Sequence, residues 1–90
     1  MTPADRPVLP RGVRLHQDRV RGVPVLLGPE TALMLDPVGQ AVLAEVDGRR
    51  DIAAISEALA ERYAAPVEMI QSDVIEFLDD MAARRLVEVA

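Results

Sequence analysis

The sequence predicts an α+β fold in which a three-stranded antiparallel β meander is followed by three helices, giving a winged helix-turn-helix-like domain. Before residue 36, an alternating segment at residues 13–18 and two short apolar runs at residues 23–28 and 31–35 are typical of strands, and after residue 36 apolar residues recur at spacings of three and four. A short turn separates the last two helical stretches, as in a helix-turn-helix. The length of 90 residues fits a single domain.

The first twelve residues are predicted to form an extended arm outside the core. Pro3, Pro7 and Pro10 interrupt this segment, and its apolar residues follow no period. Alternation begins at Val13, so we place the winged-helix-like domain at residues 13–90.

The domain is expected to start with strands separated by short turns at residues 19–22 and 28–30. Consecutive strands joined by such turns pair in the antiparallel direction. Leu33 and Leu35 share one face of the last strand. The expected strands are Val13–Asp18, Val23–Gly28 and Thr31–Leu35.

The first helix is predicted to begin at Asp36-Pro37. An Asp side chain accepts hydrogen bonds from the first amides of a helix, and Pro is well tolerated at the first helical position. Asp47-Gly48 marks the predicted end, because Gly readily adopts the left-handed cap. Val38, Val42 and Val46 fall on one face at a spacing of four, with Ala41 and Leu43 at its two margins and Gln40 opposite.

The second helix is predicted to begin after Asp51 and to end at Ala64-Ala65-Pro66, where the third begins. Both carry apolar residues at helical spacing. The apolar stripe of the second helix is Ile52, Ile55, Leu59 and Tyr63. That of the third is Val67, Ile70, Val74, Phe77, Leu78 and Met81.

The composition leaves little material for catalysis. Cysteine and lysine are absent, His16 is the only histidine, and Ser56 and Ser72 are the only serines. Thiolate nucleophiles, Schiff-base lysines and multi-histidine metal sites are therefore excluded. We expect no catalytic residue, no metal site and no cofactor.

The absence of long apolar runs argues against membrane association. No run approaches the roughly 18 residues of a membrane span, and the N-terminal segment lacks the apolar centre of a signal peptide. We expect a cytoplasmic protein.

The charge distribution argues against nucleic acid as a partner. The net charge is −5, whereas binding to phosphates requires cations. The predicted third helix would be the one to enter the major groove, yet it carries only acidic charges: Glu68, Asp73, Glu76, Asp79 and Asp80. We expect these carboxylates to form a solvated or partner-facing surface rather than a metal site.

The predicted third strand, Thr31–Leu35, is an edge strand without the usual protection. Edge strands are normally guarded by charges, Pro or bulges, because their open backbone groups recruit other strands. This segment has no charge and no Pro, so we expect it to accept an extended peptide by β-augmentation. Coverage of the same edge by the N-terminal arm or by dimerisation remains an alternative.

Short motifs distributed from Leu9 to Leu86 resemble those of the pyrroloquinoline quinone biosynthesis protein D family. Their order and spacing carry the resemblance. Pro24 stands where relatives often have a larger residue, and Arg85 where many have a helix-ending Gly. The motifs are Leu9-Pro10-Arg11-Gly12-Val13-Arg14-Leu15, Asp18-Arg19-Val20-Arg21, Leu26-Leu27-Gly28-Pro29-Glu30, Leu35-Asp36, Asp47-Gly48 and Ile70-Gln71-Ser72-Asp73-Val74.

The resemblance implies a peptide-binding winged helix-turn-helix without an active site. Such a protein binds a ribosomally made precursor peptide, PqqA, and presents it to the radical S-adenosylmethionine enzyme PqqE, which crosslinks a Glu and a Tyr of the peptide. The peptide is expected beside the third strand and against the third helix. Carried over to this chain, the peptide-binding residues are Thr31, Ala32, Leu33, Met34, Leu35, Val74, Phe77, Leu78 and Met81.

Two other classes of function stay open from the sequence. A quinone-binding or catalytic protein of the same pathway would use the arginine clusters, although no acid, base and metal set is evident. A structural or regulatory domain would dimerise through the open edge. We expect a monomer or a weak dimer.

Overall fold

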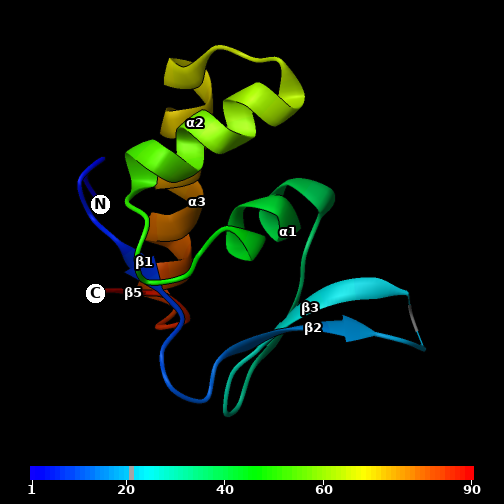
Figure 1. Cartoon of the computed structure of the whole chain (residues 1–90). Coiled ribbons are helices and arrows are strands. Elements are labelled where there is room, and N and C mark those ends of the chain that lie inside the picture. The colour runs from blue at the N-terminus through cyan, green and yellow to red at the C-terminus, as the bar shows by residue number, and fades with distance from the viewer. Residues whose placement is uncertain (21) are drawn as a thin grey trace.

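The computed structural model describes residues 1–20 and 22–90, so Arg21 in the predicted first turn lies outside the described residues. Figure 1 shows α2 crossing α3, with α1 between α2 and the sheet. The strands are β1 (Pro7–Val8), β2 (Arg14–Asp18), β3 (Val23–Leu27), β4 (Ala32–Met34) and β5 (Glu88–Val89). The helices are α1 (Pro37–Ala44), α2 (Ile52–Tyr63) and α3 (Val67–Ala83).

The predicted α+β fold is confirmed. The strands β2, β3 and β4 form an antiparallel sheet in that spatial order, and each lies within one residue of its expected bounds. Leu15 pairs with Leu26 and Leu26 with Leu33, so these side chains share one face. Leu26 is fully buried and belongs to the core.

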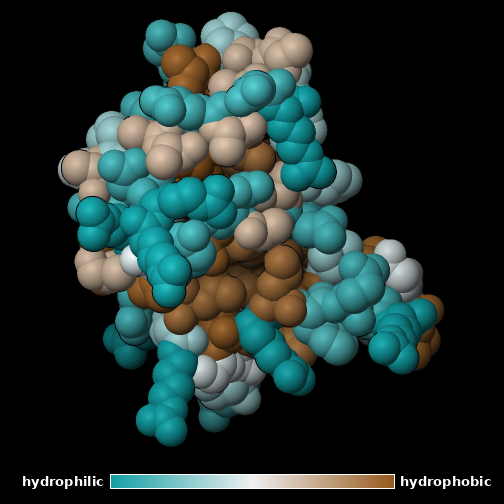
Figure 2. Space-filling model, viewed as in Figure 1, coloured by the Kyte–Doolittle hydropathy of each residue, from teal (hydrophilic) through white to brown (hydrophobic). Residues whose placement is uncertain are grey.

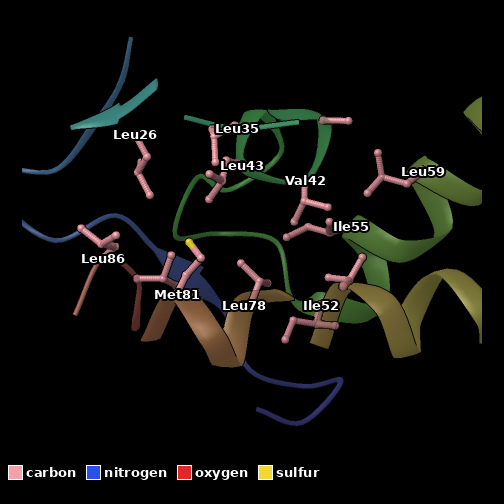
Figure 3. Packing of buried hydrophobic residues seen from close by; sticks show 13 residues of the cluster. Leu26, Leu35, Val42, Leu43, Ile52, Ile55, Leu59, Leu78, Met81 and Leu86 are labelled. Atoms are coloured by element: carbon pink, nitrogen blue, oxygen red, sulfur yellow. The ribbon is translucent and has the colours of Figure 1, made fainter. Parts of the chain in front are cut away.

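The core lies where the helices meet the inner face of the sheet. Figure 3 shows side chains from the sheet, all three helices and the C-terminal segment pointing toward one another. On the face seen in Figure 2, apolar atoms gather below α1, between the β1–β5 ribbon and the three-stranded sheet. The cluster comprises Leu26, Leu35, Ala41, Val42, Leu43, Ile52, Ile55, Leu59, Val74, Leu78, Met81, Leu86 and Val87.

The helix α1 begins as predicted, with the Asp36 carboxylate accepting from the Gly39 N–H at 2.7 Å. Its predicted end at Asp47-Gly48 is wrong, because the helix stops at Ala44. The Arg50 guanidinium donates to the backbone carbonyl of Glu45 at 3.1 Å and so satisfies an acceptor that a longer helix would use.

The predicted apolar face of α1 is buried only in part. Val42 is buried, but Val38 is 63% exposed, and Gly39, Ala41 and Leu43 are buried beside Val42. A short helix against both the sheet and α3 buries neighbouring positions rather than one stripe at a spacing of four.

The loop between α1 and α2 is held by Asp47. Its carboxylate accepts from the backbone N–H groups of Arg49 and Arg50, each at 2.9 Å. The hydrogen bonds from the Arg50 and Arg49 amides lower the pKa of Asp47 to about 2. Gly48 has a φ of +76° as a cap would, but its N–H donates to the Pro7 carbonyl at 3.0 Å, so this glycine joins the loop to the N-terminal segment.

The helix-turn-helix formed by α2 and α3 follows the predicted signals. Asp51 caps α2 by accepting from the Ala54 N–H at 2.8 Å, and Ala64 ends the helix in the left-handed conformation. Pro66 immediately precedes α3. Tyr63 departs from the predicted buried stripe, because it is 50% exposed.

The end of α3 places Arg85 in a conformation that favours glycine. Arg85 has a φ of +62°, and the following Leu86 N–H donates back to the Met81 carbonyl at 2.9 Å, as in a Schellman motif. Arg85 therefore maintains the glycine-type turn at an energetic cost, because a left-handed residue with a Cβ is less favourable by about 1–2 kcal/mol.

Replacing Arg85 by Gly is expected to raise the free energy of unfolding by about 1 kcal/mol, since the strain disappears and Gly loses slightly more entropy on folding. For a domain of this size that corresponds to roughly 4–8 °C in Tm. Arg84→Gly is the matched control, because Arg84 has a φ of −86° and gains nothing from Gly. An Arg85→Gly protein no more stable than the wild type would contradict this reading of the turn.

The N-terminal segment is extended but lies against the core, contrary to the expectation that it stays outside. The strand β1 pairs with β5, and Pro7 is fully buried. The carbonyls of Pro3 and Asp5 accept from the Ala53 and Ile52 amides at the start of α2, each at 2.9 Å. These contacts place the segment away from β4.

Among the residues that the structure describes, no helix is both long and apolar enough to span a membrane.

Candidate functional site

In the edge strand β4, the backbone N–H and C=O groups of Ala32 and Met34 point away from the neighbouring strand β3. Leu35 N–H donates to the Pro24 carbonyl at 2.9 Å, and Gly28 N–H donates to the Thr31 carbonyl at 2.8 Å. Hydrogen-bonded pairs alternate with non-bonded pairs in an antiparallel ladder. With Leu33 opposite Leu26 in this register, the backbone groups of Thr31, Leu33 and Leu35 face β3.

No described strand lies beyond β4. The sheet ends at β4, and β1, the only described strand of the N-terminal segment, pairs with β5 in the second sheet. Ala32, at the centre of the outer edge, is exposed. The N-terminal segment therefore leaves the edge open in this structure.

The predicted strand residues divide between the two faces of β4. Thr31 and Ala32 are exposed and Met34 is 60% exposed. Leu33 is half-buried and packs against the core cluster, whereas Leu35 is buried. An added strand would therefore meet an apolar side chain on the helical side of the sheet at Leu33.

The predicted residues of α3 do not all reach the surface. Phe77 is half-buried. Val74, Leu78 and Met81 are buried, at 1%, 0% and 3% exposure. Of these four residues only Phe77 and Val74 line a surface groove, while Leu78 and Met81 lie in the core beneath.

An apolar groove of about 170 Å³ opens where α1, α2 and α3 meet. Val38 and Tyr63, both largely exposed, stand at its rim, and the only charged side chain among its lining residues is Asp73. Met34 of β4 and Val38 are separated by the short connection into α1. The lining residues are Val38, Ala41, Val42, Leu59, Tyr63, Ile70, Asp73, Val74 and Phe77.

Sequence reasoning missed several of these groove residues. Val38, Tyr63 and Ile70 belong to the predicted apolar faces of their helices but not to the predicted site. The spacing of apolar residues identifies which face of a helix is apolar, but not which part of that face a neighbouring helix covers.

An acidic surface adjoins the groove. A shallow depression on α3 is lined by Asp73, Glu76, Phe77 and Asp80. Asp80 lies 3.4 Å from the Arg84 guanidinium, and Asp79 accepts from the N-terminal amine. The exposed face of α3 is therefore predominantly anionic.

The chain is expected to have no measurable affinity for duplex DNA at physiological salt, because the acidic face of α3 would repel the phosphates that dominate such binding. An electrophoretic mobility-shift titration checks this. A shift at sub-micromolar protein would contradict it.

The candidate site consists of the outer edge of β4 and the apolar groove between the helices. Within residues 1–20 and 22–90, no cluster of three or more His, Asp or Glu side chains is placed to hold a metal ion. His16 is exposed on β2, on the outer face of the sheet. Buried polar side chains in the described part of the chain all have hydrogen-bond partners, as Ser56 does with the Ile52 carbonyl.

Comparison with known proteins gives concordant matches. The family model described as "Coenzyme PQQ synthesis protein D (PqqD)" matches residues 25–87. A PqqA binding protein of Rhizobium meliloti is 44% identical over 81 residues, which cover 90% of this chain and 83% of the relative.

Solved structures share the fold. The solution structure of the PqqD part of Methylobacterium extorquens PqqCD, described as a functional, stand-alone recognition element for ribosomally synthesised and post-translationally modified peptides, matches with a TM-score of 0.84. It is 41% identical, and the match covers 97% of this chain and 93% of that one. TbiB1, solved in complex with the TbiA(beta) leader peptide, matches with a TM-score of 0.77 at 22% identity, covering 90% and 94% of the two chains. That second likeness concerns the fold alone.

The family model spans most of the chain, and the relative from Rhizobium meliloti aligns over nearly all of it. The chain therefore belongs to the coenzyme PQQ synthesis protein D family.

Proposed function

We propose that this chain binds the precursor peptide PqqA as an added strand on β4 and presents it to the radical S-adenosylmethionine enzyme PqqE, without catalysing a reaction itself. The observation that carries the proposal is the open outer edge of β4, where Ala32 is exposed and its backbone faces away from β3. The relative from Rhizobium meliloti, a PqqA binding protein, supports the same partner.

Backbone pairing supplies affinity that does not depend on peptide sequence. The N–H and C=O of Ala32 pair with one residue of the incoming strand. The side chains of that strand alternate between the two faces of the enlarged sheet. The side chain opposite Leu33 points to the helical side, because directly opposed residues share a face.

The groove supplies specificity. Its apolar lining fits an apolar side chain of the peptide, and Phe77 and Val38 are the accessible contacts. Leu78 and Met81 act from beneath by packing α3 against the core. We therefore restrict direct peptide contacts on α3 to Phe77 and Val74, and assign the other two predicted residues a supporting role.

Presentation requires that the bound peptide remain accessible to the enzyme. A peptide on an edge strand keeps one backbone edge and one face exposed, whereas a peptide inside a closed pocket would not. Catalysis is assigned to PqqE because this chain has no cysteine or lysine nucleophile and only one histidine, which leaves little material for an active site.

The test combines binding and activity. Titration of the chain with synthetic PqqA by isothermal calorimetry is expected to show saturable one-to-one binding. The rate at which PqqE crosslinks PqqA is expected to rise when the chain is added and to saturate at the same stoichiometry. Binding without any effect on crosslinking would overturn presentation alone, and absence of binding would overturn the whole proposal.

A further inference from the structure

Gly39 occupies a position in α1 where a side chain would collide with Phe77. A Cβ at this position would lie 3.1 Å from Cε1 and 3.2 Å from Cζ of the Phe77 ring, and 3.2 Å from Oδ1 of Asp36. Carbon atoms in favourable contact are about 3.5–4.0 Å apart. The ring therefore rests so close to the backbone of α1 that a Cβ at residue 39 would force the ring to shift by a few tenths of an ångström.

The conformation of Gly39 does not itself require glycine. Gly39 lies in the first turn of α1 and is absent from the glycines with positive φ. Glycine in a helix is less favourable than alanine, because it loses more conformational freedom on folding. The close approach of the Phe77 ring therefore explains why a glycine stands at position 39, although its backbone conformation is an ordinary helical one.

Phe77 lies at the boundary between two surface hollows. Its side chain lines both the apolar groove and the shallow acidic depression formed with Asp73, Glu76 and Asp80. A shift of the ring toward solvent would narrow one hollow or the other, and the groove depends on the ring for one of its walls.

We propose that Gly39 is a positioning residue for peptide recognition, which seats the Phe77 ring against α1 and so sets the shape of the groove that receives an apolar side chain of the bound peptide. This inference rests on the proposed function. Gly39 is buried and is not among the residues lining the groove, so its influence on the peptide passes through Phe77.

A double-mutant cycle between Gly39→Ala and Phe77→Leu tests the inference, with PqqA affinity and Tm measured for every variant. In the wild-type background, Gly39→Ala is expected to weaken PqqA binding about tenfold, because the ring must move. In the Phe77→Leu background the same change is expected to cost less than about twofold, since leucine has no ring at the site of collision. Gln40→Ala, in the same helix but outside the groove, is the control and is expected to bind like the wild type.

Each outcome has a defined consequence. Equal binding by Gly39→Ala and the wild type, or an equal loss in both backgrounds, would overturn the inference while leaving the proposed function in place. If Gly39→Ala fails to fold, recovery of folding in the double variant supports the Gly39–Phe77 contact, and failure to recover overturns it. Failure of the wild type to bind PqqA would overturn the proposed function and this inference together.

A measurement without peptide checks the geometry directly. The Gly39 Hα protons are expected to show nuclear Overhauser effects to the Phe77 ring and ring-current shifts that disappear in Phe77→Leu. Their absence in the wild-type protein would overturn the inference whatever the binding data show.

Discussion

Replacing the amide N–H of Ala32 by an ester oxygen is expected to weaken PqqA binding about 5- to 150-fold, or roughly 1–3 kcal/mol. The reason is that this N–H points away from β3 and would donate to the added strand, whose carbonyl would lose its partner. The free energy of unfolding is expected to fall by less than this, because the sheet loses no N–H donor and the Thr31 carbonyl, now an ester, still accepts, though more weakly, from the Gly28 N–H. Calorimetric titration and chemical denaturation of the same semisynthetic protein measure the two quantities.

The matched control is the same replacement at Leu33. Its amide faces β3 in the ladder, opposite Leu26. The ester there is expected to destabilise the fold by roughly 1–3 kcal/mol, because the bond lost is within the sheet. If the Ala32 ester bound PqqA as tightly as the wild type, pairing at this edge would be wrong and the helices alone would have to hold the peptide.

Truncating Phe77 to Ala is expected to weaken PqqA binding by about 2 kcal/mol or more, equivalent to roughly 30-fold, because large aromatic side chains in a pocket often dominate binding energy. The domain is expected to remain folded, with its free energy of unfolding lowered by about 2 kcal/mol. A fully buried Phe would cost about 3–5 kcal/mol, but Phe77 is only half-buried. Peptide titration and thermal melting distinguish the two effects.

Leu78, the next residue on α3, is the control for Phe77. It is completely buried, so Leu78→Ala is expected to cost roughly 2–5 kcal/mol of a total stability of about 5–15 kcal/mol. Its effect on binding should disappear once the data are corrected for the folded fraction. Near-wild-type binding and stability for Phe77→Ala would contradict its role as a wall of the groove.

Local signals in the sequence were sufficient for most of the fold. Asp36 and Asp51 cap helices because a carboxylate at the N-cap accepts from an amide three residues later, a pattern that needs no tertiary information. Alternation likewise predicts β2, and short apolar runs bounded by turn residues predict β3 and β4. At the end of α3, Arg85 adopts the left-handed turn that a glycine would form. The backbone hydrogen bonds of that turn are present, so α3 ends at the position where relatives with Gly would end it.

The features that were mispredicted depend on contacts between distant segments. The end of α1 follows from Arg50 binding Glu45, and the packing of the N-terminal segment follows from Asp5 and Pro3 accepting from the first amides of α2. Neither contact leaves a periodic pattern in the sequence. The prolines of this segment predict an extended arm outside the core, because they interrupt regular structure. Pro7 is nevertheless buried in the short pairing of β1 with β5, at a position where the strand does not need a backbone N–H.

Residue patterns predict only the strand part of the candidate site, whereas Val74 and Phe77 of the groove came from the family resemblance. The absence of charge and Pro in Thr31–Leu35 indicated an open edge, but the direction of each amide required the register with β3. The groove joins residues from three helices, and its rim residue Val38 and its wall residue Phe77 are far apart in the chain. Apolar periodicity cannot distinguish a side chain in a groove from one in the core.

Titration of the ¹⁵N-labelled chain with PqqA, followed by amide chemical shifts, tests the central claim most directly. The account predicts that the largest changes fall on β4, centred on Ala32, and on the groove residues Val38 and Phe77, with slowed hydrogen exchange of the Ala32 amide on binding. Changes confined to the β1–β5 ribbon, with β4 unaffected at saturation, would contradict it.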